Sequence, residues 1–266
     1  MRHPTFGWLI PALLTVAAGM SYAQLKPPPF SSGESGGAVA TRDGEVRWKN
    51  HWTMLRTTSG GQAAVHFTET GQGKYGPFTE EVRWRTDSWW ATNGSFRPLR
   101  FDKTFSDTNG KPVVRETAEF DWTKHEARFE RQELEKRKTT TQIFDVPDDT
   151  LSVEGIAAAL RAVPLTEGKV VAAHLLTNEP RLYEITLEVR AKESCDTAAG
   201  QRDCYKLELV PHLGALNLFR FAFPRSHFWY SAGPNHEWLR YEGLEAGRGT
   251  PEIVMRPAEP ARSATP

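Results

Sequence analysis

The stretch DDTLSVEGIAAALRAVP, residues 148–164, decides the fold that we predict from this sequence. It is the one convincing amphipathic helix after the N-terminus, because its apolar residues recur at helical spacing and fall on one face: Val153, Ile156, Ala157, Leu160 and Val163. Thr150 or Ser152 can cap the first free N–H groups, and Pro164 ends the helix. We therefore predict a helix over about residues 150–163 that buries its apolar face against a sheet.

Alternation of apolar and polar residues, which is typical of strands, surrounds this helix on both sides. The residues from Leu182 to Arg190 are the most regular example. The predicted strands cover residues 46–57, 62–70, 80–90, 99–106, 111–123, 139–146, 169–176, 182–190, 205–209, 219–223, 228–231, 238–242 and 252–255. Gly-Gly and Asn-Gly pairs between them, such as Asn109-Gly110, indicate tight turns. These signals predict an antiparallel meander and a mainly β (α+β) protein.

Residues 124–138 leave helix and strand open. Their content of Glu, Lys and Arg favours a helix. Their apolar residues, Ala127, Phe129 and Leu134, do not form a helical stripe. We interpret the segment as a hairpin of long, solvated strands.

The two ends of the chain differ from its body. Residues 1–23 have a basic start, an uncharged apolar stretch and a small-x-small motif, which predicts a signal peptide cleaved near Ala23. A membrane anchor is the alternative, but the apolar run is short for a bilayer span, and no second long run follows. We expect a flexible Pro/Gly/Ser-rich linker over 24–42, a single β domain over 43–256 and a disordered tail over 257–266.

Charge and aromatic content narrow the class of protein. The 33 lysines and arginines equal the 33 aspartates and glutamates, so the net charge is zero. This balance argues against a nucleic-acid partner, which would require a basic footprint. The chain has 9 tryptophans. The simplest interpretation is that they pack in the core of a sheet, and the more specific alternative is that they line an aromatic cavity.

Cys195 and Cys204 flank a short polar loop between two predicted strands. In an exported chain, an isolated pair this close is most simply a disulfide that staples a hairpin. A redox or metal pair is the alternative, but the pair lacks the CxxC spacing and has no histidine nearby. We predict the disulfide.

Several motifs look catalytic, but their context argues against catalysis. Residues 33–37 match G-x-S-x-G inside the predicted linker, and residues 71–76 match G-x-G-x-x-G before a strand instead of a helix. No histidines stand at metal-ligand spacing, although His227, His236 and Glu237 lie close enough in sequence for a site. We therefore expect no catalytic residue, no metal and no cofactor.

Several short segments in the second half of the chain occur in a recognisable order: Phe120-Asp121-Trp122, then residues 144–149, 160–168 and 239–243, and finally Thr250-Pro251. This order, over roughly residues 60–256, resembles the DUF3108 family of exported bacterial proteins of unknown function. The family looks related to lipoprotein-carrier folds of the LolA, LolB and RseB type. The resemblance implies an unclosed β-barrel, in which a curved antiparallel sheet surrounds a helix above a hydrophobic ligand cavity. This agrees with our interpretation of the sequence as one helix, packed on the concave face, and about eleven strands.

The leading hypothesis is a non-enzymatic periplasmic protein that binds an apolar or lipid-like ligand, such as a lipid or a lipoprotein acyl chain, in that concavity. A role in envelope lipid or lipoprotein handling would follow. Apolar walls with few polar groups suit such a ligand. The expected lining residues are Ile156, Leu160, Phe219, Phe221, Phe223, Trp229 and Trp238.

Two other hypotheses remain open. An envelope scaffold could recognise a protein or a cell-wall component through a sheet edge or through exposed tryptophans such as Trp89 and Trp90. A hydrolase acting on an envelope polymer is the third hypothesis. We expect a monomer without an integral membrane span after signal cleavage.

Overall fold

The computed structural model describes residues 25–197, 200–212, 225–247 and 249–258. In this part of the chain, 15 strands form one sheet. The strands are β1 (Glu34–Arg42), β2 (Glu45–Ser59), β3 (Gln62–Gly73), β4 (Val82–Ala91), β5 (Arg97–Ser106), β6 (Pro112–Asp121), β7 (Glu126–Glu133), β8 (Lys138–Asp145), β9 (Thr150–Ser152), β10 (Val170–Leu176), β11 (Leu182–Thr197), β12 (Gly200–Pro211), β13 (Ser226–Ser231), β14 (Trp238–Leu244) and β15 (Glu252–Pro257). The α-helix α1 (Ile156–Ala159) continues into the 3₁₀ turn η1 (Leu160–Ala162) between β9 and β10.

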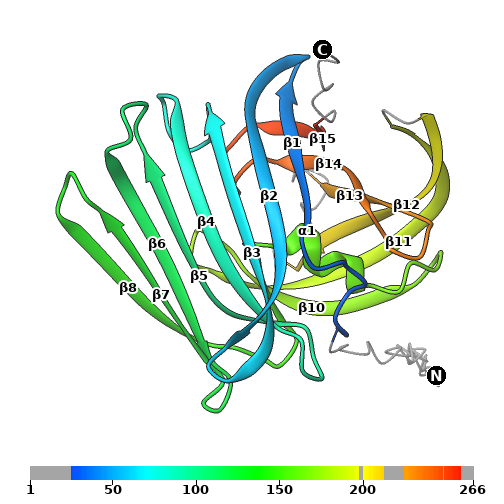
Figure 1. Cartoon of the computed structure of the whole chain (residues 1–266), viewed down its shortest axis with the longest axis horizontal. Helices are drawn as coiled ribbons and strands as arrows, with labels where there is room; N and C mark the ends of the chain where they lie inside the picture. Colours follow the sequence, from blue (N-terminus) through cyan, green and yellow to red (C-terminus); the bar gives the residue numbers. More distant parts are fainter. Residues whose placement is uncertain (1–24, 198–199, 213–224, 248, 259–266) are drawn as a thin grey trace, which may run out of the picture.

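The strand order places the first and last strands in the middle of the sheet. Strands β1 to β8 form one antiparallel meander, β10 to β15 form another, and β1 pairs with β15 between them. Strand β9 adds to the edge of the second meander, parallel to β10. Figure 1 shows a strongly curved sheet with β8 at one margin and α1 inside the curve. The predicted mainly β fold with an open, curved sheet is confirmed, but it has 15 strands instead of about eleven.

The predicted linker over residues 24–42 is wrong over its last nine residues, Glu34–Arg42, which form strand β1. Strand β1 lies within it and pairs with both β2 and β15. Leu25 is buried, and its carbonyl accepts a 2.7 Å hydrogen bond from the N–H of Phe96. Glycine is required in β1, because a Cβ atom at Gly36 would lie 2.7 Å from the indole ring of Trp52. The Gly-rich composition therefore reflects close packing under an aromatic ring, and not flexibility.

The helix is much shorter than the predicted 150–163. Residues Thr150–Ser152 form β9, whose three side chains are all buried. Gly155 has a φ of 86° in the left-handed region, so helical geometry begins only after it, and no side chain caps the first turn. Edge pairing with β10 satisfies the backbone of β9 and outweighs the helical periodicity. None of the helices in the described ranges has the length and apolar character needed to cross a membrane.

Residues 124–138 are not helical. They contain β7 and the turn into β8, so strand was the correct choice. The hairpin is larger than the predicted one, because its second strand is β8 at residues 138–145. The side chains of β8 are almost all exposed, which explains why its sequence carries little burial signal.

The core lies inside the curve of the sheet. Its central cluster joins α1 and η1 to strands of both meanders, including the fully buried side chains of Trp90, Leu160 and Tyr230. A second cluster packs around Trp48 and Trp84, and a third lies between β5–β8 and Leu176. The segment from β9 to η1 therefore acts as a plug, which we define as residues 150–162, between the two meanders.

Candidate functional site

Both meanders hold the plug in place. Gly155 lies against Trp90 of β4, so closely that an added Cβ atom would lie 2.8 Å from the indole nitrogen. The hydroxyl of Tyr230 on β13 donates a 2.8 Å hydrogen bond to the carbonyl of Ala157. Leu160 is fully buried between the two sides. In this region side chains fill the concavity under the helix.

Arg161 fixes the end of the plug. Its guanidinium donates hydrogen bonds to the carboxylate of Glu34 at 2.7 Å, to the carbonyl of Pro29 at 2.6 Å and to the carbonyl of Asn235 at 2.8 Å. The side chain is almost completely buried. One buried cation thus joins the plug, the N-terminal segment and the β13–β14 loop.

The predicted lining residues fall into three groups. Ile156 and Trp238 are half-buried and pack against the central cluster that contains Leu160. Trp238 pairs with Tyr230 across the strands, and its indole N–H is buried without an acceptor among the described residues. Trp229 does not join this group. Phe219, Phe221 and Phe223 lie outside the described residues.

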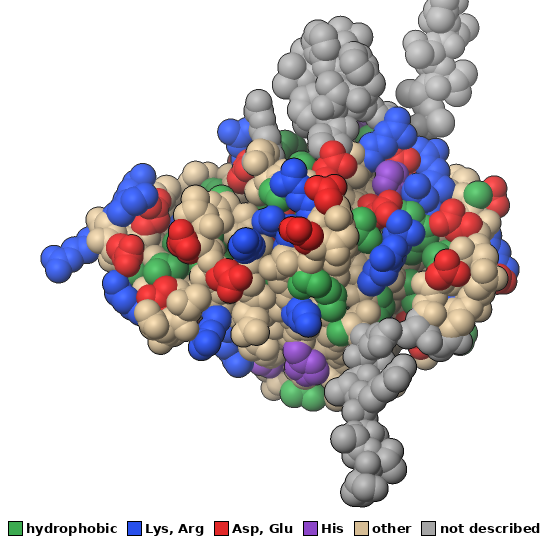
Figure 2. Space-filling model, turned by 90° about the horizontal axis from the view of Figure 1, so that it is seen from above, with side chains coloured by type: hydrophobic (Ala, Val, Ile, Leu, Met, Phe, Trp, Pro, Cys, Tyr) green, Lys and Arg blue, Asp and Glu red, His purple; other side chains and the backbone are tan. Residues whose placement is uncertain are grey.

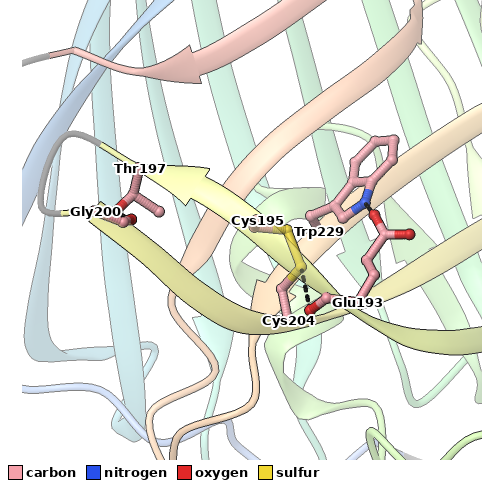
Figure 3. Close-up of a disulfide and its surroundings, with 6 residues drawn as sticks. All are labelled: Glu193, Cys195, Thr197, Gly200, Cys204 and Trp229. Carbon is pink, nitrogen blue, oxygen red and sulfur yellow. Dashed lines mark hydrogen bonds between the residues drawn. A yellow bond between two sulfur atoms is a disulfide. The ribbon is translucent and has the colours of Figure 1, made fainter.

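Trp229 points to the opposite face of β13, because neighbouring strand residues alternate between faces. There it packs with Cys195, Cys204 and Leu239. Figure 3 shows the ring beside the disulfide and the indole N–H directed at Glu193. The structure joins Cys195 to Cys204, as predicted. Trp229 therefore belongs to the disulfide cluster on the outer face, and not to the lining around the helix.

A polar row crosses the concave face of the first meander. Consecutive strands place five of its side chains in direct register, as Glu69, Thr86, Lys103, Glu116 and Arg131 on β3 to β7. Glu116 accepts a hydrogen bond from Arg131. The sequence carried one signal for this row, because Lys103 lies on the same face of β5 as the buried Phe101 and Phe105.

The plug contributes the strongest contact to this row. The ammonium of Lys103 lies 2.9 Å from the carboxylate of Glu154, and both side chains are buried. Although burial disfavours the charged form, the carboxylate of Glu154 raises the pKa of Lys103 above its usual value. Burial raises the pKa of Glu116, and it raises the pKa of Tyr75, which stands beside Lys103, to about 12. The row is a coupled set of buried charges that sequence reasoning missed.

Two hydroxyl groups near this row lack partners. The Oγ1 atom of Thr86 and the Oγ atom of Ser88 are buried on β4 without a hydrogen bond to any described residue. Unpaired buried hydroxyls are uncommon and costly. The row and its neighbour Ser88 therefore contain polar groups that are not fully satisfied.

The residues of the hydrolase hypothesis do not meet. His227 lies on the outer face near Glu208, whereas His236 hydrogen bonds to the carbonyl of Arg161. Glu237 pairs with Arg202 at 2.7 Å. Each group thus has a separate partner, and the three do not form one site.

The tryptophans proposed for partner recognition are also engaged. Trp90 is buried in the central cluster. Trp89 is stacked on His66 at 4.4 Å and lies under the guanidinium of Arg100 at 3.9 Å. Neither ring forms a free aromatic surface.

A pocket of about 480 Å³ lies on the outer face at this end of the sheet. It is lined by charged residues of β11 to β13, among them Arg190, Lys206 and His227 around Glu208. Arg190 donates a 2.9 Å hydrogen bond to Glu208, so the charges largely neutralise one another. The pocket is polar and does not fit an apolar ligand.

Comparison with known proteins gives a family and a distant likeness. The model of the family described as "protein of unknown function (DUF3108)" matches residues 41–250. None of the curated proteins is a significant match. A candidate exported protein with a YmcC-like fold from Bacteroides fragilis is 10% identical with a TM-score of 0.34, over 88% of this chain and 97% of its own. A candidate lipoprotein from Parabacteroides distasonis is 9% identical with a TM-score of 0.30, and the match covers 88% of this chain and 98% of that protein.

Proposed function

The chain belongs to the DUF3108 family, and we propose that it is a non-enzymatic periplasmic protein that binds an apolar or lipid-like ligand on the concave side of its sheet. The binding site would lie beside the plug, where Ile156 and Trp238 are half-buried. A role in handling envelope lipids or lipoproteins would follow from such a ligand.

The observation that best supports this proposal is the hydrogen-bonding environment of the Trp238 indole. Its ring packs on the central cluster, but its indole N–H is buried without an acceptor in the part of the chain that the structure describes. A buried donor without a partner costs about 1–3 kcal/mol, so a site that keeps one gains from a ligand that supplies an acceptor. An apolar ligand with one polar end, such as an acyl chain with its carboxyl or ester group, has this chemistry.

The surroundings of Trp238 support an apolar body for the ligand. Half-buried aromatic and aliphatic side chains pack on the same cluster, among them Tyr205 and Leu209 of β12 and Ile156 of the helix. Sites for apolar ligands combine such walls with a small number of polar groups. Because Leu160 and Tyr230 fill the space under the helix, the ligand would lie along the plug and not beneath it.

Native mass spectrometry of protein purified from the periplasm without detergent tests the proposal. We expect an additional mass that lipid extraction identifies as an acyl-chain compound. Trp238→Phe keeps an aromatic ring and removes the N–H, so it should weaken retention about fivefold, which corresponds to one neutral hydrogen bond. Ile156→Asn should weaken it further by placing an amide in the apolar wall.

The control is Val46→Ser, which removes an apolar side chain that is 56% exposed on β2. It should leave ligand retention unchanged. A clean ligand-free mass, together with no binding of a fluorescent fatty acid by the purified protein, would overturn the proposal.

A further inference from the structure

Strand β8 is an open edge of the sheet. It ends the strand order on one side and pairs only with β7. The opposite edge, β9, has three buried residues and lies against β5. Figure 1 shows β8 at the margin of the molecule, beyond β7 and away from the plug.

The hydrogen-bonding groups that β8 leaves free follow from its register. The N–H of Val146 donates to the carbonyl of His125 at 2.7 Å. Directly opposed residues of an antiparallel pair alternate between hydrogen-bonded and non-hydrogen-bonded positions. Even-numbered residues of β8 therefore bond to β7, whereas Thr139, Thr141 and Ile143 direct their N–H and C=O groups to the open edge.

This edge lacks the usual protection against pairing. Natural edge strands are commonly blunted by proline, a bulge or a charged side chain in the strand. The central residues 139–144 of β8 read TTTQIF, without charge, proline or glycine, and the register with β7 has no bulge. Ile143 is 63% exposed on it. The edge is therefore suited to receive another strand.

Opposite charges stand at the two ends of the same edge. Arg137 in the β7–β8 turn and Asp145 at the end of β8 are both exposed. Neither side chain has an ion-pair partner among the described residues. Asp145 lies on the face that carries Thr139, Thr141 and Ile143, and Arg137 directly precedes the strand. An antiparallel strand of the same sequence would present the opposite charge at each end.

We infer that two copies of the chain pair through their β8 strands, antiparallel about a two-fold axis beside Thr141. This register places Thr139 opposite Ile143 of the partner subunit and Arg137 opposite Asp145 of the partner subunit. Because free-edge residues face free-edge residues, the pair gains about six backbone hydrogen bonds. The two sheets become one continuous sheet, and the ion pair between Arg137 and Asp145 of the partner subunit forms twice by symmetry.

The charge distribution favours a second copy over a strongly charged partner. Figure 2 shows acidic and basic side chains interspersed over one face of the molecule, including the end that carries β7 and β8. Such a surface has no field of one sign to attract a nucleic acid or an anionic membrane. The inference is independent of the proposed ligand, whose site lies at the plug.

Sedimentation equilibrium of the purified chain from about 1 µM to about 500 µM tests the inference, because an interface built on one strand belongs to the small, weak class. We expect a monomer–dimer equilibrium. Thr141→Pro removes an N–H that points to the open edge and should abolish the dimer without lowering the melting temperature. Gln142→Pro is the matched control for the register, because it removes a bond to β7 and should destabilise the fold.

The charge pair provides a second test that does not depend on proline. Arg137→Glu or Asp145→Arg alone should weaken dimerisation about tenfold, because each places like charges opposite one another at both ends. The double variant should restore it. Thr141→Cys should form a dimer disulfide on oxidation, whereas Thr57→Cys, an exposed threonine on the interior strand β2, should not.

A monomer at all concentrations would overturn the inference and leave the edge to a strand from a different protein. A dimer that survives Thr141→Pro and both single charge variants would also overturn it, because the contact would then lie elsewhere.

Discussion

The ammonium of Lys103 on β5 lies 2.9 Å from the carboxylate of Glu154 on the plug, and both side chains are almost completely buried. Lys103 also belongs to the polar row that crosses the first meander. This ion pair joins the plug to the sheet through charge, at a site where water does not screen it.

Replacing Glu154 should therefore be costly. In Glu154→Gln the ammonium of Lys103 stays buried without its nearest carboxylate, which should lower the free energy of unfolding by about 3 kcal/mol. Urea denaturation measures this loss. The matched control is Glu135→Gln, which breaks an ion pair with Lys111 of the same 2.9 Å length at an exposed site. It should cost far less, because solvent screens an exposed ion pair, and equal losses in both variants would contradict the role of burial.

Gly155 should not tolerate a side chain. Its φ is 86°, and a Cβ atom would lie 2.8 Å from the indole nitrogen of Trp90. Gly110 has the same φ of 86°, but nothing lies within 4 Å of its Cβ position. Gly110→Ala should therefore show only the backbone strain, about 1 kcal/mol, whereas Gly155→Ala should also displace the plug and cost more. Thermal unfolding compares the stabilities of the two variants. A similar loss of stability in both would show that the ring of Trp90 moves aside at little cost.

Replacing Thr86 with valine should not lower the stability of the protein. Its Oγ1 atom is buried in the polar row without a partner among the residues that the structure describes, so Thr86→Val removes an unsatisfied hydroxyl and keeps the shape. We expect the free energy of unfolding to stay the same or to rise by up to about 2 kcal/mol. A clear loss of stability would mean that the hydroxyl binds an ordered water.

The disulfide should act as a local staple. Cys195 and Cys204 are 9 residues apart, and the chain-entropy argument gives about 2–3 kcal/mol for so short a loop. The double variant Cys195→Ser/Cys204→Ser should lose this amount in urea denaturation. Near-ultraviolet circular dichroism should change as well, because Trp229 packs on the disulfide. The wild-type protein in reducing agent should reproduce the variant, and no loss in either case would contradict the prediction.

Acid should lower the free energy of unfolding, in part because of His227 on the outer face. Burial, with the nearby charge of Lys206, lowers the pKa of His227 below 6.5. The unfolded chain then takes up this proton before the folded chain does, so the stability contributed by neutral His227 is present above pH 6.5 and is lost as the pH falls below it. Unfolding free energies from about pH 8 to about pH 5 measure this loss. His227→Gln should remove that part of the pH dependence, and a constant difference between the two proteins would contradict the assignment.

Much of the sheet could be predicted, because its strands bury one face and expose the other. The alternation from Leu182 to Arg190 lies within β11, and the Asn109-Gly110 turn separates β5 from β6. Strand β1 could not be predicted, because its glycines suggest flexibility until the ring of Trp52 is placed above Gly36. The prediction of helix for residues 150–152 was wrong for a similar reason. Leu151 pairs with β10, and local periodicity does not reveal a pairing with a distant strand.

The candidate site was less predictable than the fold. Ile156 and Trp238 do pack on one cluster. Trp229 points to the opposite face, because successive residues of β13 alternate between the two faces of the sheet. The polar row depends on the register between β3 and β7, which no single strand encodes. Its one visible sign was Lys103 between Phe101 and Phe105 on the same face of β5.

The pairing of β1 with β15 has a consequence for the order of events during synthesis. Strand β1 emerges first, yet one of its two neighbours is the last strand made, so its edge toward β15 must wait for nearly the whole chain. A waiting edge is a hazard when it is strongly apolar, because nascent chains can pair through it. The sequence of β1, ESGGAVATR, offers only small and polar side chains apart from Val39, which makes the first strand a safe one to leave open while the rest of the protein is made.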